Sequence, residues 1–232
     1  MPDECGAALS AAPQLRGGVM KKTVWAPVLL AMTLLVSGCI SVTPYVDPTL
    51  GDVPASQHVT VSSPQPVQLV FEFRTNGAVN RRATSLLQQR ATEIVRSSGL
   101  FSDVSTTPVA NGALLAIAID NIPEANAASK GFGTGLTFGL AASTVTDYYV
   151  GTAHYTPGPG ASVISAEERH SIHSVVGVGS GPPGMTPSQN LDAAFQQVLR
   201  QLMDHLLNDV ARDSAGGAHS AETGAHASVG IM

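Results

Sequence analysis

The alternation of apolar and polar residues predicts where the sheet of this chain begins. In residues 67–74, apolar side chains recur at every second position with mostly polar ones between them, which is typical of a strand with one buried face. The dipeptide Asn76-Gly77 then favours a turn. Four later segments rich in aliphatic, β-branched and aromatic residues are predicted to form further strands: 101–106, 113–122, 144–155 and 162–179, the last as one strand or two.

A period of three to four residues predicts two amphipathic helices. The first covers residues 81–98, where Asn80 can cap the start and Gly99 can end the helix in a left-handed turn. The second is expected to begin at Thr186, which can cap it, and its apolar stripe continues through residue 210. Both helices therefore have one face suited to covering a sheet.

The order of strand, helix, several strands and helix predicts an α+β domain over residues 67–211. We expect a two-layer sandwich, with a mostly antiparallel sheet covered on one face by the two amphipathic helices. Residues 39–66 contain five prolines and no clear period, so they are predicted to form an extended, lipid-anchored tether, with room for an edge strand near 58–62. Residues 212–232 are rich in small residues and are predicted to be a disordered tail.

Residues 20–38 have the features of a signal peptide. Two lysines precede an uncharged, mostly apolar run at 24–36, which is shorter than the about 20 residues of a membrane-spanning helix. Residues 1–19 would place acidic side chains ahead of this signal. We therefore expect translation to start at Met20 and residues 1–19 to be a mis-assigned leader.

The end of this signal, Leu35-Val36-Ser37-Gly38-Cys39, resembles the lipobox of bacterial lipoproteins, with Val36 where that family most often has Leu. The resemblance implies that Cys39 receives a diacylglyceryl group, that a peptidase cuts between Gly38 and Cys39, and that the new amino group is acylated, with palmitate as the expected label. Several acyl chains anchor a protein stably, whereas one gives marginal binding. Ile40 stands where Asp would retain such a protein in the inner membrane, so the resemblance implies the outer membrane, facing the periplasm. The alternative is an ordinary secretory signal or an anchor helix with a chance cysteine.

Charge and cysteine content exclude several classes of function. The chain has 12 Lys and Arg against 17 Asp and Glu and no basic run, so nucleic acid is not expected as a partner. Two cysteines cannot build a disulfide framework or a four-thiolate zinc site. Because Cys5 lies in the leader and Cys39 is the predicted lipid site, the mature domain is expected to have no free thiol.

The uncharged segment 131–146, GFGTGLTFGLAASTVT, allows two interpretations. As a helix it would place glycines four residues apart on one face, which lets two backbones approach closely. As a strand it would place Phe and Leu side chains on one face. A phosphate-binding loop is excluded because the dinucleotide spacing and the P-loop lysine are missing. The alternatives are a plain loop or closely packed strand, and a contact with lipid or a partner's apolar surface through Gly131, Phe132, Gly135, Leu136, Phe138 and Gly139.

Polar and aromatic residues of the predicted strands are the candidates for a metal, catalytic or carbohydrate-binding site. They are His170 and His173 with Glu167 and Glu168 as metal ligands, Asp120 and Asp147 as paired carboxylates, and Tyr148, Tyr149 and Tyr155 as a carbohydrate-stacking surface. Residues three apart in a strand point to opposite faces, so the histidines are not expected to share a metal. The carboxylates are expected to cap turns and the tyrosines to pack in the sheet. With no Gly-x-Ser-x-Gly elbow either, no catalytic residue, metal or cofactor is predicted.

These features predict a non-catalytic, lipid-anchored periplasmic lipoprotein with a structural or accessory role in the bacterial cell envelope. It is expected to dock to a membrane complex or to an envelope polymer. In element order alone, without shared motifs, the mature domain is similar to the envelope lipoproteins of lipopolysaccharide assembly and of curli secretion. The alternative is a carrier or chaperone that binds lipid or polysaccharide in an apolar concavity between sheet and helices. An envelope hydrolase is a third class, which converging Asp, His and Ser side chains would favour.

Overall fold

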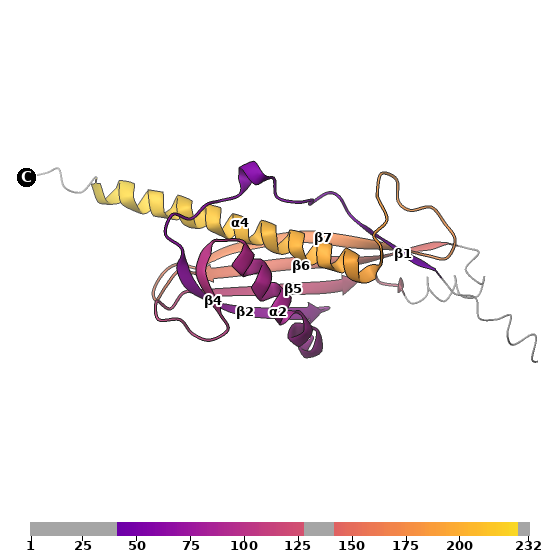
Figure 1. Ribbon diagram of the computed structural model, residues 1–232, viewed down its shortest axis with the longest axis horizontal. Helices are drawn as coiled ribbons and strands as arrows, with labels where there is room; N and C mark the ends of the chain where they lie inside the picture. Colours follow the sequence, from indigo (N-terminus) through magenta and orange to yellow (C-terminus); the bar gives the residue numbers. More distant parts are fainter. Residues whose placement is uncertain (1–40, 128–141, 227–232) are drawn as a thin grey trace, which may run out of the picture. The chain divides into compact units, whose positions relative to one another are not determined.

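The computed structural model describes residues 41–127 and 142–226, all within the compact unit Ile40–Met232. Its strands form one seven-stranded sheet in the order β1-β7-β6-β5-β2-β3, with β4 also paired to β2 (Figure 1). The strands are β1 (Val42–Val46), β2 (Gln65–Thr75), β3 (Ala78–Val79), β4 (Phe101–Ser105), β5 (Leu114–Pro123), β6 (Ser143–Thr156) and β7 (Ile164–Val176). The helices are α2 (Arg81–Ser97) and α4 (Leu191–His226), with a 3-10 turn at Ala55–Gln57.

Most neighbouring strands of the sheet run antiparallel, as predicted. The exceptions are β4 and β5, which both run parallel to β2. Two parallel neighbouring strands need a crossover connection between them. Helix α2 follows the β2–β3 turn and returns the chain to the end of the sheet at which β2 begins, so that β4 can run parallel to β2. The predicted α+β class, with its mostly antiparallel sheet, is confirmed.

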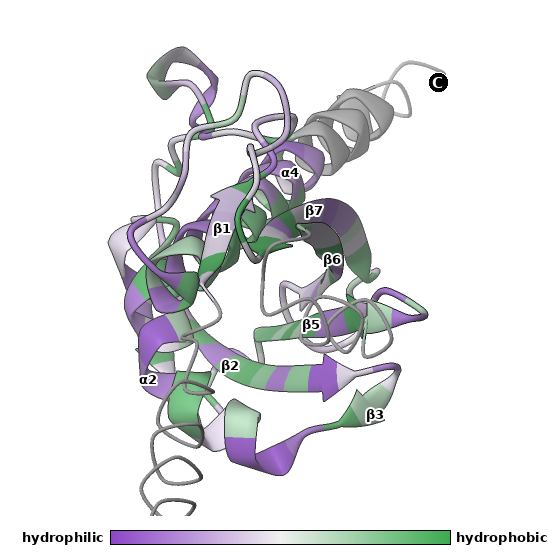
Figure 2. Cartoon of the chain, turned by 90° about the vertical axis from the view of Figure 1, so that its right-hand side faces the viewer, coloured by the Kyte–Doolittle hydropathy of each residue, from purple (hydrophilic) through white to green (hydrophobic). Residues whose placement is uncertain are grey.

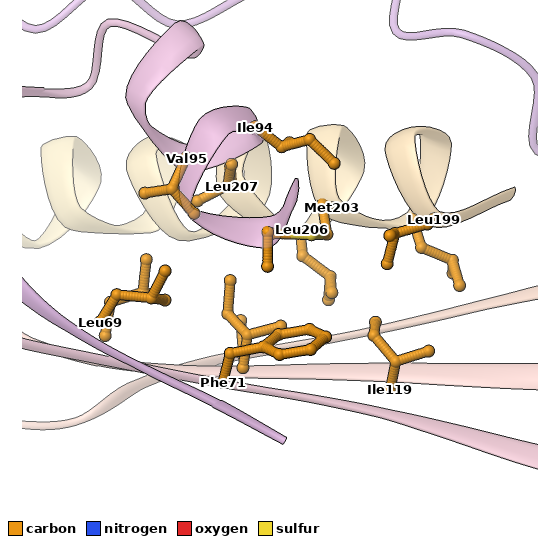
Figure 3. Close-up of a cluster of buried hydrophobic side chains, with 14 of the residues drawn as sticks. Leu69, Phe71, Ile94, Val95, Ile119, Leu199, Met203, Leu206 and Leu207 are labelled. Carbon is orange, nitrogen blue, oxygen red and sulfur yellow. The ribbon is translucent and has the colours of Figure 1, made fainter. Parts of the chain in front are cut away.

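Both helices pack on one face of the sheet, and the core lies between these two layers (Figure 3). The sheet contributes alternate residues of its central strands, because only every second side chain faces the helices. Gly151 of β6 leaves room for α4, since a Cβ there would lie 2.9 Å from Leu206 Cδ1. The main core side chains are Leu69, Phe71 and Ile119 of the sheet, Ile94 and Val95 of α2, and Leu199, Met203, Leu206 and Leu207 of α4.

The start and end of α2 agree with the sequence prediction. The Asn80 side chain caps the helix by accepting a hydrogen bond from Ala83 N at 3.1 Å. The helix ends before Gly99, whose φ of +70° lies in the left-handed region that favours glycine. The turn directs Leu100 back into the core, where it is buried.

The described part of residues 39–66 is not the extended tether that the sequence predicts. Val42–Val46 form the edge strand β1, which pairs antiparallel with β7. An edge strand tolerates the proline in this segment because its outer side needs no backbone donor. Residues 47–64, which we call the strap, then run along α4 before β2 begins (Figure 1). No strand forms at 58–62, because the strap pairs with side chains of the helix instead of with the sheet.

Helix α4 begins later than predicted. Its cap is Asn190, whose side chain accepts a hydrogen bond from Ala193 N at 2.8 Å, so Thr186 does not cap it. The residues just before the helix are held by the sheet edge, where Ser188 N donates to Pro44 O at 2.8 Å. Pairing with β1 therefore takes up the segment that the capping-box pattern assigned to the first turn.

The structure also bears on three other predicted segments, the C-terminal tail, the glycine-rich segment and residues 162–179. The tail predicted to be disordered from residue 212 is helical through His226, which the low cost of extending an existing helix and its several alanines favour. Of the glycine-rich segment 131–146, residues 131–141 lie outside the described part, while Ser143 to Thr146 belong to β6. The segment 162–179 forms one strand, β7, rather than two.

Candidate functional site

An apolar cleft opens where α4 and the strap meet β4 and β6. Its volume is about 380 Å³, within the range of about 300–1,000 Å³ that is usual for small-molecule sites. We call it the α4–β4 cleft. The apolar residues that line it are Val59, Val61, Leu100, Phe101, Tyr155, Leu207, Val210, Ala211 and Ala215, and the polar ones are Thr60, Ser62, Ser63, Gln65 and Ser214.

Four separate parts of the chain form the walls of this cleft: β4, β6, α4 and the strap. The rings of Phe101 and Tyr155 meet edge to face, with centroids 5.6 Å apart, and so join β4 to β6. Helix α4 supplies one wall through side chains spaced three and four residues apart, which a helix brings to the same face. The strap supplies the facing wall through Val59 and Val61. The result is a mostly apolar lining that also includes polar residues.

A buried amide on α4 holds the strap in place beside the cleft. Asn208 Oδ1 accepts a hydrogen bond from Val59 N at 2.9 Å, and the Asn208 side chain is buried. Strap backbone groups have no sheet partner here, so the helix must satisfy them. His58 Nε2 lies 3.1 Å from Val53 O and adds a contact within the strap. One wall of the cleft therefore depends on polar residues of α4.

A second hydrogen-bond chain links β7, α4 and the strap. His170 Nε2 lies 2.7 Å from Gln201 Oε1, and Gln201 Nε2 donates to Asp52 Oδ1 at 2.9 Å. Ser171 N donates to His170 Nδ1 at 2.9 Å. Because Gln201 uses its oxygen toward the histidine, His170 is assigned as neutral with its proton on Nε2. The hydrogen bond from Gln201, aided by the Arg200 guanidinium, lowers the pKa of Asp52.

Acidification is expected to destabilise the fold through His170. Burial lowers the pKa of His170, whereas an unfolded chain gives histidine a pKa near about 6.5. Between these two values the unfolded state binds more protons, so the stabilising contribution is present above about pH 6.5 and is lost as the pH falls below it. Urea unfolding at about pH 7.5 and about pH 5.5 should therefore give a lower midpoint at the acid pH.

The His170→Gln variant removes this titration and should lose less stability over the same interval. His154→Gln is the matched control, because His154 is exposed and hydrogen-bonds only to Ser165 on the open face of the sheet. It should keep the wild-type pH dependence. Equal acid losses in the wild type and in His170→Gln would contradict the role of His170. The raised pKa of Glu168 acts with the opposite sign, and comparing variants removes its contribution.

Two carboxyl groups have raised pKa values, Glu168 at the α4–β7 contact and Asp204 on the side of α4 that faces the strap and the end of α2. Burial raises the pKa of Glu168, and the hydrogen bond and negative charge of Asp209 raise it further. Burial also raises the pKa of Asp204. Such shifts can mark functional groups. However, within residues 41–127 and 142–226 no group of three or more His, Cys, Asp or Glu residues is placed to hold a metal ion.

The two histidines that the sequence singled out point to opposite faces of β7. His170 faces α4, whereas His173 Nδ1 lies 3.0 Å from Thr146 Oγ1 on the other face. There, Ser171 Oγ donates to Asp47 Oδ2 at 3.3 Å, and the same carboxylate oxygen lies 3.7 Å from His173 Nε2. In a Ser-His-Asp relay the serine and the carboxylate use different ring nitrogens. Here both face Nε2, so the trio fixes the start of the strap but lacks relay geometry.

The other candidate groups are not brought together either. Asp120 accepts hydrogen bonds from Gly77 N in the β2–β3 turn, as expected for a turn cap. Asp147 lies on the helix-facing side of β6, where burial raises its pKa. Tyr149 packs against Phe195 of α4, with ring centroids 5.7 Å apart.

The three tyrosines do not form one stacking surface. Tyr149 is buried under α4, whereas Tyr155 lines the α4–β4 cleft and Tyr148 is 49% exposed on the opposite face. Successive β6 residues alternate between faces, which separates Tyr148 from Tyr149. Only Tyr155 therefore belongs to the candidate site.

Several predicted site residues lie outside the described part of the chain. These are Gly38 and Cys39 of the lipidation motif and Gly131, Phe132, Gly135, Leu136, Phe138 and Gly139 of the proposed contact. None of the helices in the described ranges is long and apolar enough to cross a membrane.

The cleft has almost no signature in the sequence. The only local signal was the pair Val59 and Val61 in a segment otherwise poor in large apolar residues. This spacing of two resembles a short edge strand, but it places both side chains against α4.

Comparisons with known proteins show only weak structural similarity to solved structures. No protein-family model matches the chain, and no curated protein matches it. A Xanthomonas campestris protein of the DUF330 family is 15% identical over 72% of this chain and 94% of its own, with a TM-score of 0.39. A PelC dodecamer from Paraburkholderia phytofirmans is 11% identical over 74% and 97%, with a TM-score of 0.34. A neuraminyllactose-binding hemagglutinin homologue from Helicobacter pylori is 10% identical over 76% and 97%, with a TM-score of 0.37. At these values the likenesses establish neither a shared family nor a shared function.

Proposed function

We propose that this chain is a lipid-anchored lipoprotein of the bacterial outer membrane, facing the periplasm, with a non-catalytic accessory role in the envelope. The observation that carries the proposal is the Leu35–Cys39 sequence at the end of a signal-like segment, followed within three residues by the first strand of the described domain. A domain that begins directly after a lipid site needs no further segment to reach the membrane surface. Its proposed task is to dock to a membrane complex or to an envelope polymer.

The use of its polar residues supports a binding role rather than a catalytic one. His170, Gln201 and Asp52 connect β7, α4 and the strap, and Asn208 holds the strap beside the cleft. Catalysis requires a nucleophile, a base and an orienting group around a position for the reacting atom. The Asp47 cluster comes nearest, but its contacts suit attachment of the strap.

Changing Cys39 to serine tests the anchor. A serine oxygen cannot form the thioether that carries the diacylglyceryl group, so Cys39→Ser should abolish palmitate labelling and release the protein from the membrane fraction. Labelling in cells, followed by separation of inner and outer membranes, measures both effects. Cys5→Ser is the matched control and should change neither. Continued palmitate labelling of Cys39→Ser would refute the proposal.

A second candidate function is the carrying of an apolar ligand, and the α4–β4 cleft favours it. The cleft has a mostly apolar lining with a few polar groups, which is the usual composition of a small-molecule site. We propose an acyl chain as the ligand class, because the wall offers aliphatic and aromatic contacts and no charged side chain. Binding of a fluorescent fatty acid tests this function.

A further inference from the structure

The described chain starts at one defined end of the sheet. Ser41 O accepts a hydrogen bond from Gly177 N at 2.8 Å, and Ser41 Oγ donates to Gly177 O at 3.0 Å. Next to this pair, Val42 is in register with Val176, and Val176 is also in register with Ser143 at the start of β6. The N-terminus of β1, the C-terminus of β7 and the start of β6 therefore share one end, which we call the entry end.

Covalent geometry keeps the predicted lipid site near the entry end. Cys39 and Ser41 are separated by two peptide bonds, so their Cα atoms are at most about 7.6 Å apart. Ser41 cannot swing away, because both of its hydrogen bonds tie it to the end of β7. A lipid on Cys39 would accordingly keep this end of the sheet close to the bilayer.

Several large apolar residues near the same end are exposed. Figure 2 views the sheet from this end. Val42 is 52% exposed and Val178, which follows the end of β7, is 74% exposed. Leu191, at the start of α4, is 51% exposed and follows the segment in which Ser188 bonds to β1. Large apolar side chains that stand in water at the point where a lipid enters are suited to the boundary between head groups and acyl chains.

The register of the other strands extends this pattern. Ile122 of β5 and Tyr148 of β6 are cross-strand neighbours near the entry end, and both are among the exposed large apolar residues. At the opposite end, Val163 in the β6–β7 connection is the comparable residue, at 59% exposed. A tyrosine with an apolar ring and a polar hydroxyl suits a membrane interface.

We propose that the entry end rests on the lipid bilayer, with Val42, Val178 and Leu191 in contact with it. This inference depends on the proposed lipid anchor and adds the orientation of the domain to it. The α4–β4 cleft, lined by Tyr155 near the end of β6, then opens at the far end of the sheet, away from the membrane. The domain would present its cleft to the periplasm.

Site-directed spin labelling can test this orientation cleanly. Once Cys39 is lipidated and the leader is removed, the mature protein has no other cysteine, so Val178→Cys and Val163→Cys each carry a single reactive thiol. Both residues are exposed and of the same type, which makes Val163 the matched control. The lipidated proteins are reconstituted into vesicles of phosphatidylethanolamine and phosphatidylglycerol, labelled with a nitroxide, and measured for collisions with oxygen and with a water-soluble nickel complex.

The label at 178 is expected to lose collisions with the nickel complex several-fold and to gain collisions with oxygen, while the label at 163 behaves as in water. Aqueous behaviour at both positions, or bilayer contact at 163 alone, would overturn the orientation. Mass spectrometry of the N-terminus and flotation with the vesicles report the anchor separately. If the protein is lipidated and bound to vesicles but the labels at 178 and 163 both behave as in water, the orientation is refuted and the anchor is not. An unlipidated N-terminus would instead refute the proposed function.

Discussion

Replacing Leu206 with alanine is expected to lower the free energy of unfolding by about 2–5 kcal/mol. The Leu206 side chain is fully buried between α4 and the sheet, directly over Gly151. Its neighbours belong to a central strand and to the same helix, and neither can collapse into the space without moving the backbone. The loss thus includes both the transfer energy of the missing methyl groups and the cost of the cavity. Urea unfolding followed by circular dichroism measures it.

Leu86→Ala is the matched control, because it makes the same substitution on α2 at a side chain that is 72% exposed. Surface substitutions of this kind change stability by no more than about 0.5 kcal/mol. A similar, small effect in both variants would contradict the placement of α4 on the sheet. Since a loss of several kcal/mol is a large part of the stability of a small domain, Leu206→Ala should also be more readily degraded in cells.

The spacing of apolar residues was sufficient to predict the two-layer sandwich. Apolar residues recur at every second position in the strands and at every third or fourth position in the helices. Every second residue from Val67 to Phe73 is buried in the structure, and α2 begins and ends at the residues that cap it. These signals are local: the alternation, the Asn80 cap and the left-handed Gly99 each act within a few residues. The face that each element buries follows directly from its own sequence.

The strap could not be predicted in this way, because its partners are far away in the sequence. Val59 bonds to Asn208, and Asp52 bonds to Gln201, each across 149 residues. Prolines and the lack of a period predicted an extended tether, but they could not show that polar side chains of α4 would bind this segment. Nor could they show the β1 pairing, which a tether with no partner would lack.

The candidate site could not be predicted for the same reason, because the residues that line it are far apart in the sequence. Its lining comes from the strap with the start of β2, from β4, from β6 and from α4, and these four parts of the chain are far from one another in the sequence. Residues that were candidates for metal binding or catalysis in the sequence have structural roles instead. His170 helps to hold the strap, and Asp120 caps a turn. The sheet and helix residues that line the cleft have the sequence pattern of ordinary core positions, and only the position of the strap shows that they line a cleft.

Filling the α4–β4 cleft should abolish most binding of an apolar ligand. Ala211 lines the cleft from α4, and its replacement by phenylalanine would place a ring where an acyl chain is proposed to lie. The affinity of the chain from Ile40 onward for cis-parinaric acid, a fluorescent fatty acid, is expected to fall by about tenfold or more, equivalent to about 1.4 kcal/mol or more. Fluorescence titration measures this change, and the unfolding midpoint shows whether the variant remains folded.

Ala193→Phe supplies the control, because it places the same ring on the same helix at its other end. Ala193 lines a different cavity, beside Val46 and Pro48 and away from the strap valines. This variant should bind the fatty acid as the wild type does, so a loss confined to Ala211→Phe would assign binding to the cleft. Equal losses in both variants, or unchanged affinity in Ala211→Phe, would instead remove the cleft as the ligand site. In the proposed orientation, a ligand in this cleft would be held on the periplasmic side of the domain, where a partner could receive it without first displacing the lipid anchor.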